Sequence, residues 1–147
     1  MDKHIKKLIK TIDEYVKKAP ALPKNIKDLL VQLAPWGVII SVVAAIPTIL
    51  SVLGFGSYIE VYEMRNYMFA HVGVRYFILT IFLIANLVLR GLSISGLFAK
   101  STKGWDLLFY SILLSAIYSL VNFDIIGGII STVLSLYLLF QVREYYK

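Results

Sequence analysis

Four long apolar stretches lie between Trp36 and Phe140, and the short segments around them carry most of the charges. With 59% hydrophobic and 16% charged residues, this chain of 147 residues has too little polar surface to fold around such stretches in water. In a bilayer each stretch must satisfy its own backbone hydrogen bonds, which a helix does. The sequence therefore predicts an all-α integral membrane protein whose four transmembrane helices form two antiparallel hairpins, preceded by a cytoplasmic amphipathic helical arm.

The spans are expected at about residues 36–54, 74–92, 105–121 and 125–142. The first, of 19 residues, rises about 28 Å, which matches a hydrocarbon core of about 30 Å. The third and fourth are separated by a very short turn, so they must be adjacent and antiparallel, and Asp124 is well placed to cap the fourth helix. The C-terminal boundary of the second span is left open, because the apolar pattern could continue past Arg90 as a tilted or projecting helix.

Residues 1–35 are expected to form the basic arm, and residues 36–147 the helix bundle. Apolar side chains of the arm recur at helical spacing on one face: Ile5, Leu8, Ile9, Ile12, Tyr15 and Val16. Five lysines lie off that face and are candidate contacts for anionic lipid headgroups: Lys6, Lys7, Lys10, Lys17 and Lys18. Pro20 and Pro23 interrupt the helix, and a second short amphipathic segment then runs to Pro35, a suitable first residue for the next helix. The pattern leaves open whether the arm lies on lipid or packs on protein.

The distribution of Lys and Arg predicts the orientation. Thirteen of the fifteen fall in the arm, in the loop after the second span or at the C-terminus, and two fall in the intervening segments. By the positive-inside rule, both termini and the loop of residues 90–103 are cytoplasmic, in a cytoplasmic (inner) membrane. The aromatic segment Tyr58–Phe69 then lies at the outer interface. The net charge of +6 favours anionic lipid over nucleic acid as partner, because the arm lacks the aromatic and glycine interleaving of nucleic-acid binders.

Three spans carry a small residue every fourth position, which places the small residues on one helix face. These residues are Gly37, Ser41 and Ala45 in the first span, Ser111, Ser115 and Ser119 in the third, and Gly127, Ser131 and Ser135 in the fourth. Small residues allow close helix packing in lipid, which is the favoured interpretation. The alternative is a polar path lined by serines. It is less favoured, because serine hydroxyls can bond to carbonyls of their own helix and so need no water around them.

Three residues could line a path for a solute: Asn86 and Arg90 on one face of the second span, and Pro47 inside the first. A guanidinium within a span is a natural contact for an anion, and a proline-broken helix exposes backbone groups. The simpler interpretations are favoured. Arg90 is expected near the cytoplasmic headgroups, Asn86 is expected to bond to a neighbouring helix, and proline kinks are common in membrane helices.

The residue types needed for membrane-embedded catalysis are scarce. The chain has no cysteine and two histidines, His4 and His71, so neither a metal nor a cofactor is expected. One mixed cluster of titratable residues exists, and a solvated interfacial face is favoured for it over an acid/base or cation site: Glu60, Glu63, Arg65, His71 and Arg75. An enzyme is the least favoured class.

The first functional hypothesis is a non-enzymatic membrane subunit that works by assembling, with copies of itself or within a larger complex, while its basic arm binds lipid. A second is a small oligomeric channel or transporter for an ion past Asn86 and Arg90. A third is membrane shaping by the amphipathic arm. The sequence discloses no solute, no partner and no number of subunits.

Overall fold

The computed structural model describes residues 3–52, 74–121 and 123–147, and these residues are all-helical, as predicted, with no β-strand among them. The helices are α1 (Lys3–Val16), α2 (Lys24–Val52), α4 (Val74–Phe98), α5 (Thr102–Val121) and α6 (Ile125–Gln141), followed by the short 3-10 helix η1 (Arg143–Tyr145). The segment Tyr58–Phe69, the side chains of Glu60, Glu63, Arg65, His71 and Arg75, and the last two residues of the expected first span lie outside the described part of the chain.

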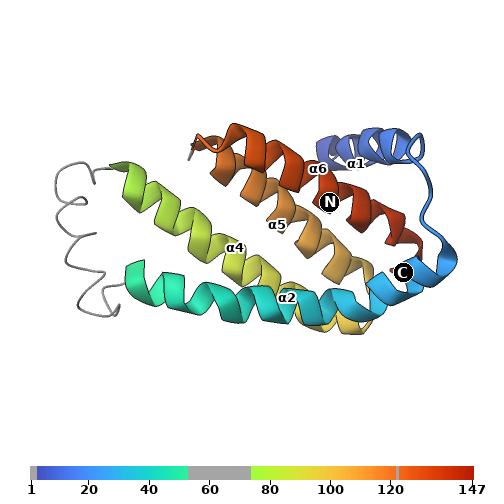
Figure 1. The fold of residues 1–147 in the computed structure, drawn as a ribbon, viewed down its shortest axis with the longest axis horizontal. Helices are drawn as coiled ribbons and strands as arrows, with labels where there is room; N and C mark the ends of the chain where they lie inside the picture. Colours follow the sequence, from blue (N-terminus) through green and yellow to red (C-terminus); the bar gives the residue numbers. More distant parts are fainter. Residues whose placement is uncertain (1–2, 53–73, 122) are drawn as a thin grey trace.

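Helices α2, α4, α5 and α6 lie side by side in that order (Figure 1). Helix α4 packs against both α2 and α5, α5 packs against α6, and α1 lies along α6. The C-terminus, the link between α1 and α2, and the α4–α5 turn lie at the right-hand end of the array in Figure 1. We call this end the base of the bundle; the α5–α6 turn lies at the opposite end.

Three helices are long and apolar enough to cross a membrane: Lys24–Leu50, Thr80–Phe98 and Thr102–Val121. The fourth apolar helix, α6, has 17 residues and rises about 26 Å, somewhat less than the usual hydrocarbon thickness. The three long helices therefore have the length and composition that insertion into a bilayer requires.

Two helices are longer than expected. Helix α2 is continuous from Lys24 to Val52, whereas the sequence predicts a new helix at Pro35. Pro35 lies in line with Val31 and Val38 on one buried face, so continuing the helix buries all three together. The first turns of α2 incline relative to the rest (Figure 1), as expected where a proline removes one helix hydrogen bond. Helix α4 continues past Arg90 to Phe98.

The α4–α5 turn holds two glycines in direct backbone contact. A Cβ on Gly96 would lie 2.5 Å from the Cα of Gly104, and a Cβ on Gly104 would overlap the backbone of Gly96 and Leu97. The Ser101 N–H donates to the carbonyl of Gly96 (2.9 Å), and Lys100 adopts a positive φ of 51°, as at many helix C-termini. The two missing side chains therefore set how closely α4 and α5 approach at the base.

The α5–α6 turn is equally short. Asp124 caps α6 by accepting a hydrogen bond from the N–H of Gly127 (3.2 Å), which confirms the predicted cap. Phe123 precedes it with a φ of 60°. One turn into α6, Gly128 lies directly against Ser119, where a Cβ would collide with the serine side chain. The antiparallel α5–α6 pair is thus fixed at this end by a cap and a glycine.

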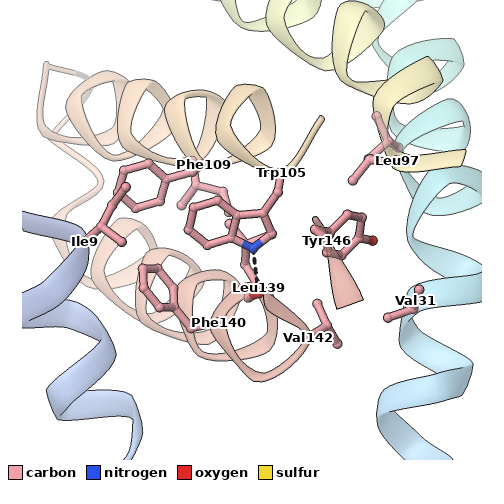
Figure 2. Packing of buried hydrophobic residues seen from close by; sticks show 11 residues of the cluster. Ile9, Val31, Leu97, Trp105, Phe109, Leu139, Phe140, Val142 and Tyr146 are labelled. Atoms are coloured by element: carbon pink, nitrogen blue, oxygen red, sulfur yellow. Dashed lines mark hydrogen bonds between the residues drawn. The ribbon is translucent and has the colours of Figure 1, made fainter. Parts of the chain in front are cut away.

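An aromatic cluster forms the core at the base (Figure 2). The ring of Trp105 stacks on Phe109, with centroids 5.5 Å apart and planes within 6°, and meets Phe140 edge-on at 5.2 Å. Its indole N–H donates to the carbonyl of Leu139 (3.0 Å). Ile9 of α1, 2% exposed, packs into this cluster, and Ile5, Ile12 and Val16 pack against it, whereas Leu8 and Tyr15 of the arm are exposed.

Candidate functional site

Polar side chains of α4 and α5 meet inside the helix array. The amide of Asn86 donates to the carbonyl of Ser111 (2.8 Å) and to the hydroxyl of Ser115 (2.7 Å). The Ser115 hydroxyl in turn donates to the carbonyl of Ser111 (2.9 Å). Asn86 therefore ties α4 to α5, which is the role that an amide within a span usually has.

We expect Asn86→Leu to lower the free energy of unfolding by about 0.6–1.7 kcal/mol, the range measured for hydrogen bonds between membrane helices. The variant keeps the size of the side chain and removes both interhelical bonds. Unfolding of the detergent-solubilised protein by increasing fractions of SDS measures the change. Ser131→Ala is the control, because Ser131 is exposed and its hydroxyl bonds only to the carbonyl of Gly128 within α6 (3.2 Å). An equal loss in both variants would contradict a tie at Asn86.

Arg90 lies one turn further along the same face of α4. Its Nε donates to the hydroxyl of Ser111 (3.1 Å). Within the described part of the chain the guanidinium has no acidic partner, and its two Nη atoms make no hydrogen bond. Because α4 continues for eight residues to Phe98, Arg90 lies about 12 Å from the end of the helix, further from it than a span of residues 74–92 predicts. The site therefore contains a cation without a counter-ion.

Two adjoining cavities share Arg90 and Ser41. The larger, about 380 Å³, is an open groove between α2 and α6 that reaches the base; Gly37, Ser111 and Ser135 also line it. The smaller, about 190 Å³, continues away from the base between α2, α4 and α5; its walls include Ala45, Phe82, Leu83, Leu87 and Tyr118. We call them the base groove and the inner pocket. Arg90 lies where they meet.

Tyr146 borders the base groove at its lower end. Its side chain is 5% exposed and extends between Val31 and Leu97 in Figure 2. Its hydroxyl is buried and has no hydrogen-bond partner among residues 3–52, 74–121 and 123–147, and burial raises its pKa above the usual value for tyrosine. A buried hydroxyl is nearly always paired, so this atom is a donor without an acceptor. Sequence reasoning missed Tyr146, because nothing in its local pattern signals burial.

The small residues of the predicted stripes have several different neighbours. Gly37, Ser41 and Ser135 line the base groove, and Ala45 lines the inner pocket. Ser111 and Ser115 contact α4, whereas Ser119 contacts Gly128 of α6. Gly127 lies at the Asp124 cap and Ser131 is exposed. Pro47 lies within α2 and lines neither cavity.

The five lysines of the arm, Lys6, Lys7, Lys10, Lys17 and Lys18, are exposed. Lys17 forms an ion pair with Asp13 (2.6 Å), which also lies 3.9 Å from Arg143 near the C-terminus. The arm thus presents its cations outward while Ile9 anchors it to the core.

The link after α1 is tied to the end of the chain. The Tyr137 hydroxyl donates to the carbonyl of Pro20 (2.6 Å), and the N–H of Leu22 donates to the Gln141 side chain (3.2 Å). Lys27 pairs with Glu144 (3.0 Å). A hydrogen bond to Asp28 raises the pKa of Tyr145 to about 12. We call these contacts the clasp.

Within the described part of the chain, the side of α4 that faces away from Asn86 and Arg90 has no partner helix except at its end, where the ring of Phe98 meets Trp36 of α2 edge-on (5.8 Å). Its exposed residues recur at spacings of 3, 4, 3, 4 and 3: Ile81, Ile84, Val88, Gly91, Ser95 and Phe98. We call this row the free face of α4. A Cβ on Gly91 would have no atom within 4 Å. Sequence reasoning missed the row, although its heptad spacing is visible in the sequence.

Among the residues that the structure describes, no group of three His, Cys, Asp or Glu side chains could hold a metal ion. Comparison with known proteins returned no matching family model, no matching curated protein and no matching solved structure. The class of protein is therefore described from the structure alone. It is a small helical protein that has three helices able to cross a membrane and a polar cluster between helices.

Proposed function

We propose that this chain is a non-enzymatic membrane subunit that assembles with a second copy of itself through the free face of α4. In this proposal α2, α4, α5 and α6 all cross the bilayer. The base, with both termini, is cytoplasmic, because Lys and Arg are concentrated in the arm, in the segment of residues 100–103 and at the C-terminus. The observation that carries the proposal is the exposed heptad row on α4.

A heptad row with small residues favours another helix over lipid as its neighbour. Lipid tails accept any apolar surface, whereas a spacing of 3.5 residues keeps one stripe of a helix against a partner over several turns. Gly91 and Ser95, four residues apart and both exposed, let two backbones approach closely. Around them, Ile81 and Val88 are 49% and 51% exposed and provide bulk for packing.

The partner is expected to present the same row. Contact between identical faces gives a closed two-fold dimer, whereas contact between different faces continues into rings or filaments. Within the free face, Gly91 and Ser95 of each copy would lie where the two α4 helices cross. The dimer therefore requires no other surface of the chain.

Substitution of Gly91 by leucine tests the dimer, because the new side chain would hold the two backbones apart. Gly37→Leu is a matched control. A Cβ on Gly37 also meets no atom within 4 Å, but Gly37 belongs to α2 and not to the free face of α4. We expect wild type and Gly37→Leu to be dimers by native mass spectrometry in mild detergent, and Gly91→Leu to be a monomer with unchanged helicity.

Because the chain has no cysteine, single cysteines report proximity without background. Ser95→Cys is expected to cross-link into a covalent dimer in membranes, whereas Ser131→Cys, equally exposed on α6, is expected to remain monomeric. A dimer of Gly91→Leu as stable as the wild type, or equal cross-linking at both cysteines, would refute assembly through α4.

The other two functions have less support. Asn86 and Arg90 lie on the side of α4 opposite the free face, so a dimer through that face would not place them around a shared pore, and Asn86 is occupied in bonds to α5. Membrane shaping requires the apolar face of the arm to enter lipid, but Ile9 on that face is 2% exposed.

A further inference from the structure

Arg90 carries a charge that nothing in the described structure neutralises. Among the described residues, the guanidinium makes one hydrogen bond, from Nε to the Ser111 hydroxyl (3.1 Å), and the three ion pairs lie elsewhere, at Asp13 and Glu144. An ionised group within a membrane span is costly unless an anion or water compensates it. The guanidinium also retains two nitrogens in the planar arrangement that suits an oxyanion. Arg90 therefore has the properties of an anion-binding side chain.

Tyr146 supplies a second, independent sign of a missing ligand. Its side chain is 5% exposed, its hydroxyl has no partner, and it borders the same base groove as Arg90. Leaving a buried hydroxyl without an acceptor costs free energy that a bound acceptor would recover. Arg90 of α4 and Tyr146 of the C-terminal segment are far apart in the sequence, and their side chains border one cavity.

The cavities have the shape and lining of a site for an amphiphile. The base groove, about 380 Å³, combines Arg90, Tyr146 and serine hydroxyls with leucine walls, and falls within the usual size range of ligand sites. Along α2 its lining runs from Leu30 to Ser41, about 16 Å. The inner pocket of about 190 Å³ continues from Arg90 away from the base, with Phe82, Leu83 and Leu87 in its wall. The polar groups of Asn86 and Ser115 also line the inner pocket, so the two cavities meet at polar groups around Arg90 and both have apolar walls.

We propose that the base groove and inner pocket bind one anionic phospholipid. A phosphate oxygen of its headgroup contacts the Arg90 guanidinium, another headgroup oxygen accepts from the Tyr146 hydroxyl after that side chain turns into the groove, and an acyl chain enters the inner pocket. The groove opens between α2 and α6, which is where a lipid can enter from the side. This site is separate from the lysines of the arm and from the free face of α4, so it does not depend on dimer formation.

The test uses the full chain in detergent and native mass spectrometry with three probes: phosphatidylglycerol, phosphatidylcholine and inorganic phosphate. We expect phosphatidylglycerol to bind at least about tenfold more tightly than phosphatidylcholine, because only its headgroup has a net charge for Arg90. Inorganic phosphate lacks the acyl chain and is expected to bind at least about tenfold more weakly than phosphatidylglycerol.

Variants assign the binding to the groove. Arg90→Gln is expected to weaken phosphatidylglycerol at least about tenfold, and Arg90→Lys to restore part of the affinity, since lysine keeps the charge without the planar fork. Tyr146→Phe removes only the hydroxyl and is expected to weaken binding about fivefold. Gly37→Leu fills the groove from α2 and is expected to abolish binding, whereas Gly91→Leu on the free face is expected to bind normally.

Three results would overturn the proposal. Equal affinity of phosphatidylglycerol and phosphatidylcholine would remove the role of the charge. Binding of inorganic phosphate as tight as that of the lipid would indicate a site for free anions. Unchanged lipid binding in both Tyr146→Phe and Gly37→Leu would place the lipid elsewhere, and this holds even if Arg90→Gln fails to fold. If Gly91→Leu loses the dimer but still binds the lipid, the lipid site does not depend on assembly, and the two proposals are tested separately.

Discussion

The variant Gly104→Val is expected to lose the packing of α5 against α4 at the base and to unfold at a lower SDS fraction than the wild type. A Cβ on Gly104 would overlap the backbone carbon of Gly96 and the backbone nitrogen of Leu97, and backbone atoms cannot rotate away as a side chain can. Overpacking usually costs about 1–3 kcal/mol where side chains can move, so a backbone collision should reach about 3 kcal/mol or more. Circular dichroism during SDS titration measures the loss.

The control for Gly104→Val is Gly37→Ala, where a new Cβ meets no atom within 4 Å. Alanine in a helix interior is favoured over glycine by about 0.5–1 kcal/mol, so this variant is expected to be slightly more stable than the wild type. The same class of change thus has opposite signs at the two positions. A midpoint for Gly104→Val close to that of the wild type would contradict the close approach of α4 and α5.

Trp105→Ala is expected to destabilise the protein by about 3–5 kcal/mol, the range for removing a large aromatic side chain from a core. Trp105 is 2% exposed and its ring packs against both Phe109 and Phe140 (Figure 2). The Arg143 guanidinium also lies 5.2 Å from the ring centroid, so the variant removes a cation–π contact at the C-terminus. Loss of near-ultraviolet circular dichroism at a lower SDS fraction than in the wild type measures the effect.

Trp105→Phe separates the two contributions of the tryptophan. Phenylalanine keeps an aromatic ring against Phe109 but leaves the carbonyl of Leu139 without its donor, which should cost about 1–3 kcal/mol. If Trp105→Phe proves as destabilising as Trp105→Ala, the ring packing contributes little and the hydrogen bond dominates.

The elements that are determined by residues close together in the sequence could be predicted from the hydrophobic pattern and from local chemistry. Apolar runs of span length predicted the long helices, because a backbone in lipid has few alternatives to a helix. The short turn before α6 predicted the Asp124 cap, since a carboxylate at that position can accept from the first N–H groups of the helix.

Features that depend on tertiary packing were not predictable in the same way. Pro35 suggested a helix start, but its alignment with Val31 and Val38 on a buried face keeps α2 continuous. The serine spacing of α5 predicted a packing face without its neighbour, and Ser111 and Ser115 contact α4. The groove between Arg90 and Tyr146 joins residues 56 positions apart, which no local pattern relates.

The clasp has a consequence for the order in which the protein matures during translation. The arm leaves the ribosome early. Tyr137, whose hydroxyl donates to the carbonyl of Pro20, is synthesised 117 residues later. At about 5–20 residues per second, roughly 6–23 s separate the two events. During that interval the apolar face of the arm, including Ile9, lacks the aromatic residues that later cover it. Lipid or a chaperone therefore has to shield this face of the nascent chain until the last helix is complete.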